Sequence, residues 1–276
     1  MVITTQDVVT EESVMAMVQA QTEANYGFRR FFRDHNGDAA GPSMKFPLTK
    51  EDFDGAMEEV EQGTEYPKYE KEYGDVEAVY TKYGFEVDIS DEALEDGILD
   101  LRMDQTRDMI REEARRLNSI AAGVVSGNLG ATYGDNAGSL TFNEVVDSRA
   151  KMMKYDDTES EAGYTPDLLL VEPLGAASIL KDDAFKLRDT PVGDRVVLDG
   201  FIGSVAGMDI FEDNSGQIGD YNAYMADTSR YGYESAKYRG DVSSRREENQ
   251  DKTVYKLKDR LDWVSTQPKG VAKIEG

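Results

Sequence analysis

The sequence predicts an α+β fold in which extended elements precede a compact α/β unit. A helical pattern runs from Ser90 to Ser126, well beyond the average globular helix of about 11–12 residues. A tyrosine-rich stretch with strand-like alternation comes before it, and short apolar runs with clear capping signals follow it. We therefore divide the chain into five segments: 1–50, 51–89, 90–138, 139–242 and 243–276.

The composition is strongly acidic, with 55 acidic against 31 basic residues and a formal net charge of −24. The acids are spread along the whole chain, which indicates a solvated surface and not a single acidic patch. This charge argues against sequence-independent binding to nucleic acid, which depends on Lys and Arg, and against binding to an anionic membrane. Because concentrated salt screens such self-repulsion, we hypothesise that the protein is adapted to molar salt.

Cysteine is absent, which excludes disulfides, thiolate chemistry and cysteine-ligated zinc. The single histidine, His35, begins a glycine-rich loop that extends to Ser43, where we expect a solvated side chain. No stretch reaches the roughly 18 apolar residues of a membrane span. The N-terminal residues carry acids where a signal peptide would be apolar, so we expect a soluble protein that is not secreted by that route.

Two amphipathic helices are predicted in the N-terminal quarter of the chain. The first spans residues 10–33 and ends in an aromatic group, Phe28, Phe31 and Phe32, that is flanked by arginines. It either docks on the chain's own core or acts as an arm that lies on a neighbouring subunit. The second helix spans about 50–62 and starts with residues that resemble a capping box.

A tyrosine-rich β-hairpin is predicted next, with its turn at Gly74-Asp75, because glycine at the first central position suits a type II′ turn. From Tyr83 to Ile89 the apolar residues alternate with Gly, Glu and Asp, as in a half-buried strand. The outer part of the hairpin carries almost no apolar residue, and an isolated two-stranded ribbon is marginal in water. The hairpin must therefore lie on its own domain or on a neighbour.

The long helix is expected to begin at Ser90, an N-cap residue, with Ile89 and Leu94 spaced as a hydrophobic staple. It carries two apolar stripes, one with Leu94, Ile98, Leu101 and Met109, and one with Met103, Ile110, Leu117, Ile120 and Val124. Between the stripes lie opposite charges at helical spacing: Asp104 with Arg107, Asp108 with Arg111, and Glu112 with Arg116. Such a helix packs on more than one side, either inside a large domain or as a support between a domain and its neighbours.

The rest of the chain predicts an α/β unit followed by returning strands. Thr141 and Glu144 form a capping box for a helix that ends near Lys154, and Pro173 opens another helix. Apolar runs predict strands, of which the first is buried on both faces: 168–171, 196–198, 201–211, the ambiguous segment up to 241, and two short strands near 255 and at 271–274. Polar or charged segments are expected to be loops or exposed: 127–138, 155–165, 212–222 and 243–252.

A search for catalytic and ligand-binding motifs assigns no site. The sequence holds no credible Ser-His-Asp arrangement, no Walker A loop and no G-x-G-x-x-G. Asp34, Asn36 and Asp38 imitate the first EF-hand ligands, but Ala39 and Lys45 stand where glycine and glutamate are required, and segment 213–219 fails in the same way. Paired carboxylates occur throughout and single out no acid–base couple. We therefore assign no catalytic, cofactor-binding or metal-ligating residue, and expect a non-enzymatic protein without cofactors.

Five segments, taken in order, carry a resemblance to a known family. Residues 83–90 lead directly into the long helix, residues 142–153 and 166–173 supply a helix and a buried strand, residues 203–211 form a strand with glycine, and residues 263–274 contain Pro268 before a final strand. This order resembles the major capsid protein of tailed viruses with the Hong Kong 97-type fold, which encapsulin shells share. The segments are similar to the family's extended loop entering its spine helix, its axial domain and its C-terminal ending, and the resemblance covers roughly 50–276.

The resemblance implies an icosahedral shell of hexamers and pentamers around double-stranded DNA, which the protein contacts non-specifically, with no membrane. It implies an N-terminal arm (1–50), an extended β-hairpin loop with its preceding helix (51–89), a peripheral domain with the spine helix (90–138), an axial domain (139–242) and return strands (243–276). Portal, scaffold and cement proteins are implied partners, in a virion assembled in the host cytoplasm. Some members cross-link a lysine of the extended loop to an asparagine; Lys68, Lys71 and Lys82 are present, but no acceptor is assigned.

Joined to the acidic composition, the resemblance suggests a virus of a halophilic archaeon. Three other interpretations remain open at this point. An encapsulin-like compartment would need a groove for a cargo peptide, and a halophilic carbohydrate-active enzyme would use a pair of Asp or Glu side chains. The third is a non-viral surface or filament protein.

Overall fold

The computed structural model describes a set of ranges that together hold most of the chain: 27–36, 41–49, 60, 65–66, 73–90, 99–135, 138–154, 163–182 and 201–276. In residues 36, 49, 73, 89, 99–106, 201 and 202 only the backbone is described. Several sequence predictions lie outside these ranges: most of the first helix, the helix over 50–62 except Val60, the start of the long helix at 91–98, the acidic loop 155–162 and the strand at 196–198.

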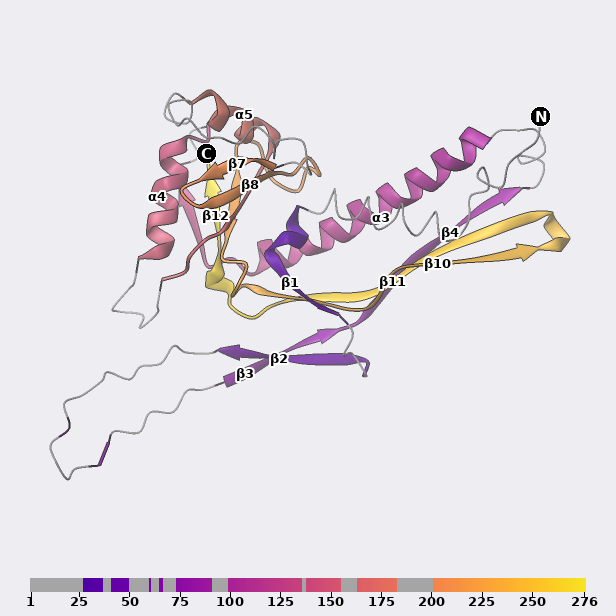
Figure 1. Cartoon of the computed structure of the whole chain (residues 1–276), viewed down its shortest axis with the longest axis horizontal. Helices are drawn as coiled ribbons and strands as arrows, with labels where there is room; N and C mark the ends of the chain where they lie inside the picture. Colours follow the sequence, from indigo (N-terminus) through magenta and orange to yellow (C-terminus); the bar gives the residue numbers. More distant parts are fainter. Residues whose placement is uncertain are drawn as a thin grey trace.

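The molecule has a compact α/β unit at one end, from which a long helix and long ribbons extend (Figure 1). Helix α3 (Leu99–Gly127) and the hairpin of β10 (Gly232–Glu247) and β11 (Lys252–Ser265) run outward from this unit (Figure 1). A second ribbon, β2 (Ser43–Thr49) with β3 (Tyr73–Val79), lies apart from the helix (Figure 1). The α+β class is thus confirmed.

A four-stranded sheet supports the long helix, in the order β1-β10-β11-β4. β1 (Phe32–Asn36) pairs in parallel with β10, whereas β10–β11 and β11–β4 (Thr81–Ser90) are antiparallel. The predicted half-buried strand is confirmed in β4, where Tyr83, Phe85 and Val87 are half-buried between exposed neighbours. The strand near residue 255 was expected to be short, but β11 has 14 residues, because it pairs with β10 and β4 together.

Over residues 107–125, helix α3 buries a single face, because pairs of buried residues alternate with pairs of exposed ones. The prediction of two stripes that pack on more than one side is wrong for this part of the helix, since Met109 and Ile110, from the two predicted stripes, lie on the same face. Met109 and Ile110 are buried against Val242 and Leu257 of the sheet. Further along, the helix enters the main core through Leu117, Ala121 and Val125. The predicted ion pair between Asp108 and Arg111 is present at 3.4 Å, whereas Glu112 contacts Arg115 at 3.9 Å and not the expected Arg116.

A six-stranded sheet forms the compact unit, in the order β5-β12-β9-β6-β8-β7. Its strands are β5 (Ala131–Gly134), β6 (Leu168–Val171), β7 (Phe201–Val205), β8 (Met208–Glu212), β9 (Ala223–Ala226) and β12 (Val271–Glu275). The unit's helices are α4 (Phe142–Met153), which starts with the predicted Thr141–Glu144 capping box, and α5 (Pro173–Lys181), which Pro173 opens. β6 is buried on both faces, as its apolar run predicts, whereas β5 corrects the expectation of a continuous loop over 127–138.

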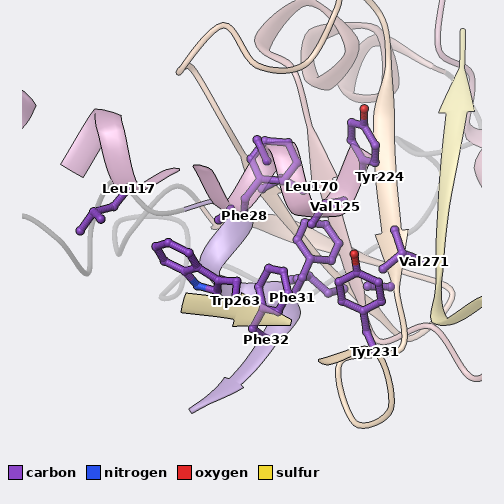
Figure 2. Packing of buried hydrophobic residues seen from close by; sticks show 14 of the residues in the cluster. Phe28, Phe31, Phe32, Leu117, Val125, Leu170, Tyr224, Tyr231, Trp263 and Val271 are labelled. Atoms are coloured by element: carbon purple, nitrogen blue, oxygen red, sulfur yellow. The ribbon is translucent and has the colours of Figure 1, made fainter. Parts of the chain in front are cut away.

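A cluster of buried side chains, rich in aromatic residues, fills the junction between the two sheets and α3 (Figure 2). Phe28 packs edge-on against Tyr224 with ring centroids 5.5 Å apart, and Phe32 lies 5.2 Å from Tyr231. The prediction of a helix through residue 33 is wrong here, because Phe28–Phe31 is a 3₁₀ turn (η1) and β1 follows directly. The aromatic residues are buried in the chain's own core, and a straight α-helix would not deliver Phe32 into the parallel pairing with β10.

Two other local predictions are wrong for a common reason. Gly74-Asp75 is not a turn but lies within β3, opposite Leu48 and Pro47 of β2. His35 is not in a solvated loop but in β1, with its ring 5.4 Å from that of Phe46. In both places, pairing with a strand distant in sequence overrides the local turn preference.

Candidate functional site

We take the surfaces that extend from the compact unit as the candidate functional surfaces of this chain. We distinguish the β2–β3 ribbon and the three-stranded ribbon, which is formed by 85–90 of β4, 241–247 of β10 and 252–258 of β11. In the described ranges, no group of three or more His, Cys, Asp or Glu side chains is placed to hold a metal ion. Asp34 and Asn36, the EF-hand imitators, are strand residues of β1.

The β2–β3 ribbon has one polar and one apolar face, because successive side chains of a strand point to opposite sides. On the polar face Lys45 forms an ion pair with Asp75, and Ser43 donates a hydrogen bond to Glu77. Met44, Phe46, Val76 and Ala78 form the apolar face, and it packs on Tyr233 and Val264 at the ribbon's root. A ribbon with one polar and one apolar face is suited to lie flat on another surface.

Tyr80 fixes the root of this ribbon, as the single residue between β3 and β4. Its side chain is buried, and its hydroxyl is 2.7 Å from the hydroxyl of Ser235. One residue earlier, the Val79 N–H donates to the Asp262 carboxylate at 2.8 Å. Burial raises the pKa of Asp262, although this N–H and that of Trp263 stabilise its charged form. The direction of the ribbon is therefore set by β10 and β11.

The three-stranded ribbon carries a network of ion pairs on one face. Arg245 and Lys256 both bind the Glu86 carboxylate, at 3.0 and 3.1 Å. Lys252 binds Asp88 at 2.6 Å and Glu247 at 3.4 Å. Val254 pairs with Arg245 of β10 and with Asp88 of β4, and it is buried although both of these partners are charged. Hydrogen bonding from Lys256 and the charge of Arg245 lower the pKa of Glu86, which favours the ionised form of this carboxylate.

Buried charges lie where the helix, the sheet and the N-terminal segment meet. Glu234 of β10 is 1% exposed, and Arg29 and the Trp263 indole donate to it at 3.0 and 3.1 Å. Arg239 also forms an ion pair with Glu234. Asp259 of β11 and Glu113 of α3 complete the group, and both are buried. The sequence offered one signal for this cluster: Glu113 occupies an apolar-stripe position, between Ile110 and Leu117.

A second buried polar group links three distant segments. Asn118 of α3 accepts a hydrogen bond from the Phe28 N–H at 3.1 Å and donates one to the Asp213 carboxylate at 3.2 Å. Asp213 in turn accepts the Ser215 N–H at 2.8 Å. Position 27 packs closely against this group. A Cβ at this position would lie 2.2 Å from Asp213 Oδ2, so a residue larger than glycine would clash there. Asn118 therefore holds the aromatic turn, the long helix and the loop after β8 together.

The compact unit presents its own exposed apolar side chains. Leu174 and Leu180 of α5 are 47% and 42% exposed, and Met153 stands at the end of α4. Of the lysines considered for cross-linking, Lys82 lies in β4, whereas Lys68 and Lys71 fall outside the described residues. No described helix combines the length and the apolar character needed to span a membrane.

Comparison with solved structures shows that this fold is similar to that of capsid-type structures. The capsid of Ralstonia phage GP4 matches with a TM-score of 0.67 and 11% identity, covering 88% of this chain and 86% of that one. A structure from Mycobacterium phage Che8 matches with a TM-score of 0.61 and 14% identity over 90% of both chains. The SrpI encapsulin complex from Synechococcus elongatus PCC 7942 matches with a TM-score of 0.60 and 10% identity, covering 99% and 91%.

The sequence itself carries the family assignment, because residues 75–274 match the family described as phage capsid protein. The chain belongs to this family of structural proteins. No curated protein matches the sequence. The matched range begins in β3 and ends in β12, so it includes the long helix, the six-stranded sheet, the four-stranded sheet except β1, and the three-stranded ribbon.

Proposed function

We propose that this chain is the major capsid protein of a tailed virus, with a Hong Kong 97-type fold, and assembles into hexamers and pentamers of an icosahedral shell around double-stranded DNA. The family supports a capsid role, and the β2–β3 ribbon is the observation that carries self-assembly. This ribbon extends away from the body (Figure 1), and the described contacts of its apolar face, with Tyr233 and Val264, lie near its root. Because a two-stranded ribbon is marginal alone, neighbouring copies cover the remainder.

In this proposal, each of the five segments defined from the sequence has its own role in the capsid protein. Residues 90–138 with α3 form the peripheral domain, 139–242 the axial domain, 243–276 the return strands, and 51–89 the extended loop with its preceding helix. Residues 1–50 form the N-terminal arm, although 28–36 and 43–49 lie in the chain's own turn and strands. Portal, scaffold and cement proteins complete the virion, which assembles in the host cytoplasm, contacts DNA non-specifically and involves no membrane. The charge of −24 supports a halophilic archaeal host.

Electron microscopy of the purified full-length chain in molar potassium chloride tests this proposal directly. Closed spherical shells, or six-fold and five-fold rings, are the expected particles. Analytical ultracentrifugation on the same sample should place nearly all the protein in these assemblies. A monodisperse folded monomer would contradict the proposal, and fibres would instead support a filament protein.

An encapsulin-like compartment is the second candidate, because the SrpI encapsulin complex matches over 99% of this chain. The contents of particles isolated from producing cells separate the two functions. Nuclease-protected double-stranded DNA is expected for the virion, whereas a protein cargo and no protected DNA would support the compartment.

A further inference from the structure

Two acidic side chains face each other across the interface between the long helix and the sheet. Glu113 lies on the buried stripe of α3 and is 4% exposed. Asp259 lies on β11 between the buried residues Leu257 and Leu261 and is 1% exposed. Both carboxyl groups line the same pocket and act on each other's charge, so keeping both of them ionised in this buried position would be costly.

The surroundings of the two carboxyl groups differ. Asp259 Oδ1 accepts the Gly240 N–H at 2.7 Å, a bond that favours the charged form of Asp259. In the described part of the chain, no N–H or O–H group donates to either oxygen of Glu113. An ionised buried carboxylate without donors is costly, so Glu113 is the group that holds the proton.

Charge counting in the buried cluster gives the same result. Three buried carboxyl groups, on Glu113, Glu234 and Asp259, stand against the guanidinium groups of Arg29 and Arg239. If all three carboxyl groups were ionised, the cluster would hold one uncompensated negative charge. A single proton makes it neutral.

The other charged groups around the pair are exposed or paired elsewhere. A pocket of about 330 Å³ lies beside the two carboxyl groups, and Lys82, Glu112 and Arg116 line its exposed wall. On the sheet, Asp241 is paired with Lys258 at 2.8 Å. Tyr83 and Leu117 complete the wall near the pair. None of these groups replaces the missing donor to Glu113.

We propose that Glu113 and Asp259 share one proton in a buried carboxyl–carboxylate hydrogen bond that clamps helix α3 onto the sheet, and that losing this proton releases the clamp. The proton resides on Glu113 and is donated to the Asp259 carboxylate. When it leaves to solvent, two adjacent buried carboxylates repel each other across the interface. The clamp is therefore strong in acid and at neutral pH, and weak in alkali.

The pKa of Glu113 is shifted in the direction that this clamp requires. Burial, and after it the neighbouring Asp259 carboxylate, raises the pKa of Glu113 to about 9 from the model-peptide value of 4.5. A group whose folded pKa is raised contributes stability that is complete below its unfolded pKa and is lost as pH rises to the folded value. Between these two pKa values, the unfolding equilibrium constant should increase by up to about tenfold for each pH unit.

The test compares thermal unfolding of the full-length protein with Glu113→Gln from pH 5 to pH 10 at constant molar salt. The glutamine amide donates to Asp259 without a titrating proton, so the variant should lose most of the decline between pH 5 and pH 9 and exceed the wild type above pH 9. Glu112→Gln is the matched control, because Glu112 is the exposed neighbour of Glu113, and it should follow the wild-type curve. If Glu113→Gln does not fold, Asp259→Asn removes the neighbouring carboxylate and should show a smaller decline that ends at lower pH, because burial alone then raises the pKa of Glu113.

Two results would overturn the proposal. Parallel pH profiles for the wild type and Glu113→Gln would mean that Glu113 is an ionised carboxylate solvated by water in the pocket. Added magnesium or calcium chloride that restores wild-type stability at pH 10, but does not change Glu113→Gln, would mean that the pair holds a metal ion. An infrared band of a protonated carboxyl group at pH 7 that disappears at pH 10 and is absent from Glu113→Gln supports the shared proton directly.

Discussion

At the scale of single residues, the buried polar side chains decide how distant segments meet. Asn118 and Glu113 both lie on the buried stripe of α3, where a purely apolar helix would pack with less specificity. Asn118 is satisfied by a donor and an acceptor from two other segments, whereas Glu113 depends on a proton. Such groups are costly when left unpaired, so each fixes one arrangement of its neighbours.

Replacing Asn118 by alanine tests this role. The change leaves the Phe28 N–H and one Asp213 oxygen without their partner, and each buried unpaired group costs about 1–3 kcal/mol. We expect a clear drop in the midpoint of guanidinium unfolding. Ser119→Ala, at the half-buried next position, is the control and should stay close to the wild type. Equal midpoints for both variants would show that Asn118 is not a structural link.

At the scale of elements, the long helix and the strands of the sheet stabilise each other. Leu257 is fully buried between α3 and the neighbouring strands, whereas Lys256 points to the opposite, charged face. Leu257→Ala should cost about 2–5 kcal/mol, as other large-to-small changes in cores do. Lys256→Ala should cost far less, because exposed ion pairs contribute little. Chemical unfolding of both variants in one buffer compares them, and similar losses would mean that the ion-pair face carries the ribbon's stability.

The elements also show where sequence reasoning succeeds and where it fails. The Thr141 capping box, the buried strand at 168–171 and the helix opened by Pro173 are local signals, and the structure confirms all of them. The turn at Gly74-Asp75 and the loop at His35 were mispredicted because their strands pair with partners far away in sequence. Of the candidate site, the sequence analysis predicted neither Glu113 nor Asp259. The position of Glu113 between Ile110 and Leu117 was a signal that it did not use, whereas nothing local relates Asp259 of β11 to α3.

At the scale of the whole molecule, net charge sets the conditions in which the fold and any assembly persist. A charge of −24 on 276 residues repels itself and repels neighbouring copies, whereas the ion pairs of the three-stranded ribbon attract. Salt screens both effects. The repulsion involves the whole surface and the attraction only a few exposed pairs, each worth about 0–1 kcal/mol, so screening favours the folded and assembled states.

The proposed adaptation to salt therefore predicts a loss of assembly on dilution of the salt. The Debye length grows from about 3 Å at 1 M salt to about 30 Å at 0.01 M, so repulsion between acidic copies acts across whole interfaces in dilute buffer. Light scattering during stepwise dialysis from molar potassium chloride should show particles dissociating, and circular dichroism should show unfolding at lower salt still. Sucrose added at low salt is the control, because it favours compact states without screening charge. Particles that persist unchanged in dilute buffer would contradict a halophilic origin while leaving the capsid assignment intact, since that assignment depends on the family match and not on charge.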